Sequence, residues 1–234
     1  MQVQEKESLD HQTKKILIQE MLDQQEAIER IRGHNLQLIN EPAEYRKPLY
    51  EFKLEKNPQK VKLFIAFFLK MAADSGQGSG SGASNSVNDG IIDSRREQIL
   101  QEIDNVYMKD DTKKIAEAIS HVSFSSRNQD FIVEVCCKLH QIYEEFSALL
   151  IQSIIKVYKE PQNTRAQNYV LYREFNRKRY ILRILTELYL KGLFQHYKDM
   201  FTCMNELILI TKTDQQSFLN AIMVLTDYFK TYGE

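Results

Sequence analysis

The residues best suited to chemistry in this sequence are basic, and they gather in one span. Between positions 165 and 191, seven Lys and Arg residues face only two Glu residues, and tyrosines lie among them. Residues four apart share a helix face, which pairs Arg173 with Arg177 and Arg179 with Arg183. Cations interleaved with aromatic rings can bind phosphates and stack on bases. The span predicts a site for RNA or an acidic partner, formed by Arg173, Arg177, Lys178, Arg179 and Arg183.

The same span also has a structural interpretation, which the sequence leaves open. Long basic side chains often cover a solvated helix face and pair with acidic residues of a neighbouring helix. In that case the cations hold two helices together and bind no ligand.

A second group, Cys136, His140 and Glu144, is spaced as consecutive turns of one helix. Such spacing can begin a metal site, but no second Cys/His cluster supplies the remaining ligands. A Cys–His nucleophile in the middle of a core helix would also lack oxyanion donors. Phosphate-binding loops, His-Glu-x-x-His and Gly-x-Ser-x-Gly are absent from the sequence. We therefore expect no catalytic residues, no metal and no cofactor, and hence no enzyme.

The elements that must position these residues are helices. The chain has 234 residues, of which 8 are Gly and 4 are Pro. That is too few for the turns of a sandwich or barrel, and no Gly-rich strand-to-helix turn of an α/β fold occurs. With 43% hydrophobic residues, an all-α protein can still build a core.

Charge, cysteines and hydropathy bear on the compartment. The formal net charge is −1, so any nucleic-acid binding must come from a local cluster. Three cysteines, two of them adjacent, are typical of a reducing compartment. No signal peptide or membrane span is visible. We expect a cytoplasmic protein, including a perinuclear location, with no membrane contact.

The chain divides into four predicted segments. Residues 1–57 form an N-terminal helix, with a thin apolar stripe at about 13–32, and a Pro-rich connector. Residues 58–73 form a strongly apolar helix that packs on or leads into the following domain. Residues 74–92 form a flexible Gly/Ser linker that contains most of the glycines. Residues 93–234 form a helical-repeat domain.

Apolar residues recur at helical spacing from about position 110 to the C-terminus. They predict six helices in three antiparallel pairs, and Gly192 suits the left-handed position that ends the long helix. Successive pairs that bury their faces on one another favour a right-handed, HEAT-like solenoid. The array ends after the sixth helix, so we expect a partial domain from a longer repeat.

Three stretches carry a resemblance to a known family. They are Phe131-Ile-Val-Glu-Val-Cys-Cys-Lys-Leu-His-Gln-Ile-Tyr143 with Phe146, the run from Leu182 to Phe194, and the last helix ending Tyr228-Phe-Lys-Thr-Tyr-Gly-Glu234. Together they resemble the first middle-of-initiation-factor-4G domain of the up-frameshift scaffolds of nonsense-mediated mRNA decay. The match covers about residues 95–234, truncated after about three helical repeats.

The resemblance implies a scaffold in mRNA surveillance. Its expected partners are other decay factors, namely up-frameshift proteins and exon-junction components, together with RNA. The alternative is a translation-initiation or splicing adaptor with the same domain, which docks an RNA helicase. The residues that match the family's motif, with structural roles, are His140, Tyr143, Phe146, Glu187, Leu188, Gly192 and Phe194.

Overall fold

The computed structural model describes residues 2–74, 85–122, 128–160, 167–210 and 215–232. Within these ranges nearly every segment is helical, and the only β pairing is one isolated bridge between Glu55 and Val106. The all-α prediction is confirmed.

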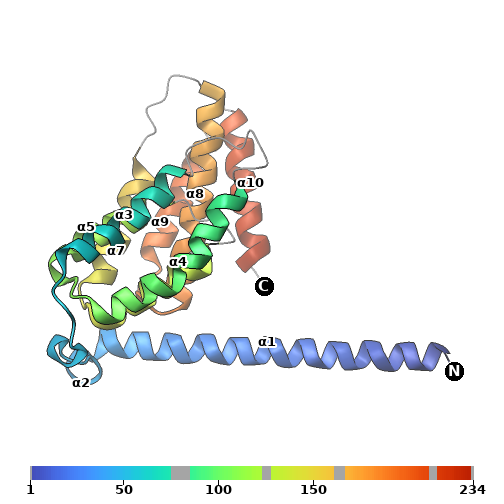
Figure 1. Cartoon of the computed structure of the whole chain (residues 1–234). Helices are drawn as coiled ribbons and strands as arrows, with labels where there is room; N and C mark the ends of the chain where they lie inside the picture. Colours follow the sequence, from blue (N-terminus) through green and yellow to red (C-terminus); the bar gives the residue numbers. More distant parts are fainter. Residues whose placement is uncertain (1, 75–84, 123–127, 161–166, 211–214, 233–234) are drawn as a thin grey trace.

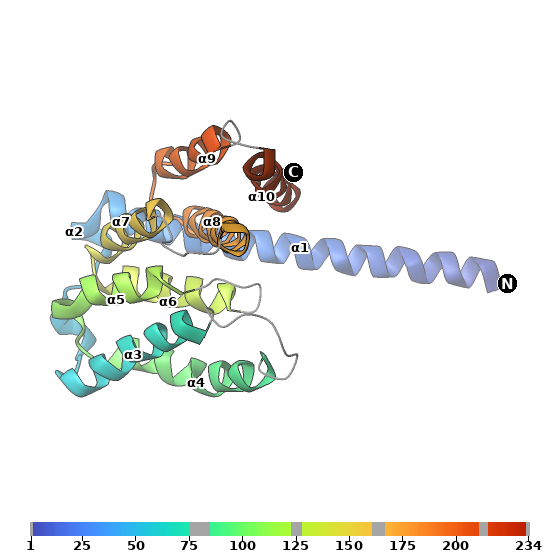
Figure 2. The ribbon, with the colours of Figure 1, turned by 90° about the horizontal axis from the view of Figure 1, so that it is seen from above.

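Four helix hairpins stack in succession, as Figure 2 shows from above. Helices α3 and α5 contact each other, as do α5 and α7, and then α7 and α9; on the other side α4, α6, α8 and α10 contact one another in the same order. This alternation is the solenoid predicted from the sequence. The hairpins are α3 (Pro58–Asp74) with α4 (Asn85–Asn105), α5 (Thr112–Ser120) with α6 (Gln129–Ile142), α7 (Phe146–Lys159) with α8 (Gln167–Leu190), and α9 (Lys198–Ile210) with α10 (Gln215–Tyr232).

The core runs through all four layers because every hairpin presents an apolar stripe to its neighbours. Phe64 and Phe68 of α3 are fully buried, as are Ile103, Phe131 and Leu188 on later helices. Burial of such side chains is worth about 2 kcal/mol each. Helix α3 therefore forms part of the first layer of the solenoid. Of the two predicted arrangements for residues 58–73, packing on the repeat domain or leading into it, the structure shows the first.

The predicted linker differs from the structure at its C-terminal end. Helix α4 begins at Asn85, so positions 85–92 are helical, whereas 75–84 lie outside the described residues. Extending a helix that is already nucleated costs little per residue. Ile99 and Ile103, both buried, supply that nucleus.

Helix α1 (Gln2–Asn40) is much longer than the predicted helix at about 13–32. Among the residues of α1 whose burial is described, only Asn35 and Leu38 near its C-terminal end are buried, and the N-terminal half projects beyond the hairpins (Figures 1 and 2). The connector that follows contains two short turns, α2 (Pro42–Tyr45) and η1 (Leu49–Phe52). None of the described helices is long and apolar enough to cross a membrane.

Candidate functional site

The basic span of α8 is engaged mainly within the protein. Arg183 lies 3.2 Å from the Asp227 carboxylate of α10, and Arg179 lies 3.8 Å from it. Arg177 donates to the Glu160 carbonyl at 2.6 Å. These contacts match the structural interpretation of the span, in which the cations hold neighbouring helices together. The side chain of Arg173 lies outside the described residues.

Lys178 departs most from a surface role, because only 5% of the residue is exposed. Its ammonium lies 4.1 Å from the centre of the Tyr158 ring, 3.1 Å from the Tyr158 carbonyl and 3.8 Å from the Glu174 carboxylate. Burial lowers the pKa of Lys178. Packing against α7 turns this side chain inward, so it does not present its charge on the outer surface with the neighbouring arginines.

The C-terminal end of α8 is built as the sequence predicts. Gly192 has φ +75°, its N–H donates to the Tyr189 carbonyl at 2.9 Å, and the Leu193 N–H donates to the Leu188 carbonyl at 3.0 Å. These two bonds form a Schellman motif, in which a left-handed residue ends the helix. The prediction of a left-handed Gly192 is confirmed. Phe194 then packs its ring 5.7 Å from that of Tyr189.

The same turn anchors α1. A Cβ atom on Gly192 would lie only 2.7 Å from the Arg32 carbonyl oxygen, so only glycine lets α1 approach this closely. The Asn35 side chain donates to the Lys191 carbonyl at 2.8 Å, which satisfies one of the free carbonyls at the end of α8. Arg32 also lies over the Tyr189 ring, 5.3 Å from its centre.

A buried polar network joins α1, α6 and α7 at His140. The ring Nε2 lies 3.3 Å from the Asn35 carbonyl oxygen and Nδ1 lies 2.6 Å from the Ser147 hydroxyl. A carbonyl oxygen only accepts, so Nε2 carries the proton and Ser147 donates to Nδ1. Burial lowers the pKa of His140 to about 4, and the ring is neutral at pH 7.

Ser147 and His140 share the hydrogen bond that a catalytic nucleophile makes with its base, but they lack the solvent access and the carboxylate partner of a catalytic site. His140 is 1% exposed and Ser147 is 6% exposed, so no substrate reaches the hydroxyl. The third member is a backbone carbonyl, which orients the ring without stabilising a positive charge as a carboxylate does. The network thus positions three helices.

The turn between α6 and α7 carries two further motif residues. Tyr143 accepts a hydrogen bond from the Met108 N–H at 2.8 Å and donates to the Val106 carbonyl at 3.2 Å, and burial raises its pKa to about 12. Phe146 is fully buried at the start of α7. Between α8 and α10, Glu187 accepts a hydrogen bond from the Tyr232 hydroxyl at 2.8 Å. All seven motif residues therefore lie at helix junctions or in the core.

Arg46, which follows α2, closes the end of α6. One guanidinium nitrogen donates to the carbonyls of His140 and Gln141, at 2.5 and 3.2 Å, so a side chain satisfies two C-terminal carbonyls of that helix. Burial lowers the pKa of Arg46, and the charges of Glu144 and Glu145 oppose this shift.

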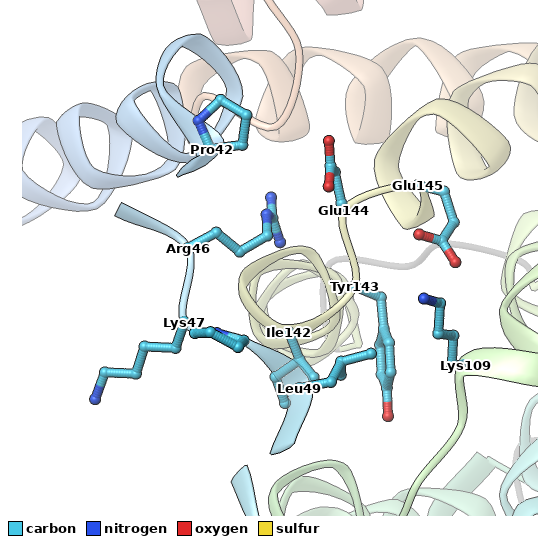
Figure 3. Close-up of a pocket in the computed structure, with 10 residues that line it drawn as sticks. Pro42, Arg46, Lys47, Leu49, Lys109, Ile142, Tyr143, Glu144 and Glu145 are labelled. Atoms are coloured by element: carbon cyan, nitrogen blue, oxygen red, sulfur yellow. The ribbon is translucent and has the colours of Figure 1, made fainter. Parts of the chain in front are cut away.

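Beside Arg46 opens a cleft of about 400 Å³, shown in Figure 3. Leu49 and Ile142 give it an apolar floor, and Lys47, Lys109, Glu144 and Glu145 carry charges of both signs around it. Its remaining lining residues are Pro42, Arg46, Pro48 and Tyr143. A cleft of this composition suits a short peptide segment better than a polyanion.

The cysteines give no indication of metal binding. Cys136, Cys137 and Cys203 are free and buried, and burial raises the pKa of Cys137 to about 11. In the described part of the chain, no three His, Cys, Asp or Glu residues lie close enough together to hold a metal ion.

Sequence reasoning missed Asn35 and Arg46, two of the polar side chains that hold the N-terminal region to the solenoid. Asn35 contacts residues more than 100 positions away in the sequence, and Arg46 contacts residues 94 and 95 positions away. Only the position of Arg46, in a Pro-rich connector just after a helix, carried a signal.

Comparisons with known proteins agree with this architecture. The solved structure of the first MIF4G domain of human nonsense-mediated decay factor UPF2 superposes with a TM-score of 0.63, at 18% identity, over 89% of this chain and 58% of that one. The regulator of nonsense transcripts UPF2 from Arabidopsis thaliana is 23% identical over 143 residues, or 61% of this chain. This chain spans only 12% of that relative's length. No family model matches the chain. In its fold, the chain is similar to the first MIF4G domain of human UPF2.

Proposed function

We propose that this protein is a non-enzymatic scaffold in nonsense-mediated mRNA decay, which binds other proteins, and RNA, through the surface of its helical repeat. The single observation that carries the proposal is the likeness to UPF2, in sequence over 143 residues and in fold over 89% of the chain. Its cytoplasmic, including perinuclear, location is part of the same proposal.

The architecture suits a scaffold. Stacked hairpins present an extended surface for partners, and extended binding surfaces are what repeat proteins use. The buried Ser–His pair, the one arrangement with nucleophile geometry among the residues discussed above, is closed to substrates. A short segment of a decay factor, such as an up-frameshift protein or an exon-junction component, would bind in the Arg46 cleft, with its apolar residues on Leu49 and its charges at the rim.

The expected RNA binding of α8 is weaker than the sequence alone predicts. Arg179 and Arg183 already neutralise Asp227, and Lys178 is buried, so α8 has less free charge than its composition implies. RNA would therefore bind weakly, and the salt dependence of its affinity would be shallow because few counterions are released. Charge reversal of Arg177 and Arg179 tests whether α8 takes part.

The discriminating experiment is affinity purification with mass spectrometry, using the chain and a cleft variant, Leu49→Glu with Lys47→Glu. Decay factors recovered with the chain and lost with the variant would support the scaffold and its cleft. Leu63→Glu with Lys62→Glu is the matched control, because both side chains are exposed on α3, away from the cleft. Recovery of RNA helicases and cap-binding proteins in place of decay factors would favour the initiation or splicing adaptor. If neither group of proteins is recovered, both functions are refuted.

A further inference from the structure

The projecting part of α1 exposes a run of large apolar side chains. Ile18, Met21 and Leu22 are each more than half exposed, as are Ile16 and Leu17. A solvated helix with such a stripe is marginal by itself, because most helical stability in proteins comes from packing an apolar face. Apolar patches of this kind mark interaction sites.

The stripe forms one wall of a groove. Ile18, Met21, Leu22, Gln25 and Ile28 share a helix face, and the groove along them ends against Leu190 of α8, with a volume of about 570 Å³. We define the α1 stripe as Leu17, Ile18, Met21, Leu22 and Ile28. The α1 stripe lies N-terminal to the part of the helix where Asn35 and Leu38 are buried in the solenoid.

We propose that the α1 stripe is the contact between two copies of this chain, paired as antiparallel helices. This inference does not depend on the proposed function. Its first support is the sequence Leu17-Ile-Gln-Glu-Met-Leu22, which is nearly symmetric about its centre. A two-fold axis between Gln19 and Glu20 brings Ile18 of each copy level with Met21 of the other, and Leu17 level with Leu22, so apolar residues meet apolar residues.

Charge favours the antiparallel direction. Lys14 and Lys15 precede the stripe, whereas Asp23, Glu26 and Glu29 lie within or after it. About the same axis, Lys15 of one copy approaches Glu26 of the second copy, and Lys14 comes level with Gln25. A parallel pair in register would instead place the lysines opposite lysines, and like charges across a helix interface are unfavourable.

The shape of the molecule leaves room for this pairing. The hairpins lie along the C-terminal half of α1, and its N-terminal half extends away from them (Figures 1 and 2). Two antiparallel copies therefore carry their solenoids at opposite ends. The overlap runs from about residue 7 to Arg32, which is about 40 Å at 1.5 Å per residue.

Light scattering after size exclusion tests the proposal, with the chain at about 1 to about 100 μM, the range where modest helix pairs associate. We expect a mass twice the 27.5 kDa of one chain, falling to one chain mass for Met21→Glu with Leu22→Glu. Arg30→Glu is the matched control, since it changes the net charge by the same amount on the opposite face of α1 and should leave the dimer intact. Circular dichroism checks that each variant retains its helices.

A monomer throughout this concentration range would overturn the proposal, and so would a dimer that survives the double substitution. The direction of pairing is read from disulfides in an equal mixture of Ile18→Cys and Met21→Cys chains, since the native cysteines are buried. Antiparallel helices enrich the mixed disulfide above half of the linked product. Enrichment of the two homodimeric products would contradict the antiparallel arrangement.

Discussion

Replacing Gly192 with alanine probes the junction between α8 and α1 most directly. A non-glycine residue in the left-handed region costs about 1–2 kcal/mol, and the lower entropy of the unfolded alanine chain offsets about 0.4–1 kcal/mol of this. The added Cβ would also lie 2.7 Å from the Arg32 carbonyl oxygen, so the α1 backbone must move. That movement strains the Asn35–Lys191 hydrogen bond, worth about 1 kcal/mol. We expect a net loss of about 2 kcal/mol.

Urea unfolding followed by circular dichroism measures this loss, and the melting temperature should fall by about 4–8 °C. Gly33→Ala is the control, because it lies inside α1 with no atom within 4 Å of its Cβ position, and it should stabilise by about 0.5–1 kcal/mol. Gly192→Asn separates the two causes, since asparagine tolerates the left-handed conformation but still carries a Cβ atom. If Gly192→Ala unfolds at the same urea concentration as the unchanged chain, the account of this junction is refuted.

Three further substitutions test the network around α6 and the interior of α8. Burial lowers the pKa of His140 to about 4, so the unfolded chain binds a proton at this residue first as the pH falls below about 6.5. The contribution of neutral His140 to the unfolding free energy is fully present above that pH and drops by up to about 3 kcal/mol towards pH 4. Urea titrations at several pH values should find this slope missing from His140→Asn. Arg46→Met should cost about 1–2 kcal/mol in the same assay. Arg46→Lys should not restore it, because the ammonium of the shorter lysine side chain does not reach both carbonyls. Lys178→Met should lower the unfolding free energy by about 1–3 kcal/mol, because it leaves the Tyr158 carbonyl and the Glu174 carboxylate without the ammonium. It should leave RNA affinity unchanged, and a loss of RNA binding would place Lys178 at a phosphate.

The repeat could be predicted from the sequence because its signal is local. In α6, positions such as Phe131, Val135 and Leu139 recur every four residues, and all are buried. The end of α8 was equally readable, since Gly192 is one of few glycines beyond the linker and has the left-handed conformation that a helix end favours. Periodicity and capping depend on residues within one or two turns.

What the sequence did not reveal depends on contacts between distant segments. No residue near Lys178 in the sequence predicts that its side chain turns towards Tyr158 while Arg177 and Arg179 stay half-buried. A helix of period 3.6 points these three side chains in different directions, and the packing of α7 determines which of them is buried. Asn35 is similar. Its environment is made by α6 and by the end of α8, so the residues near Asn35 in the sequence carry no signal of its burial.

Docking of α1 and pairing of α1 should be separable, because they use different parts of the same helix. Docking uses the region from Arg32 to Asn40, where Gly192 and His140 lie, whereas the proposed pairing uses the α1 stripe, which is exposed in the single chain. Gly192→Ala should therefore lower the unfolding free energy of the solenoid and leave the dimer mass unchanged at concentrations where the chain is folded. Met21→Glu with Leu22→Glu should do the reverse, dissolving the dimer with little effect on the urea midpoint of a dilute sample. If Gly192→Ala alone dissociates the dimer while the chain stays folded, the two copies contact each other through the docked end of α1, and the stripe is not the interface.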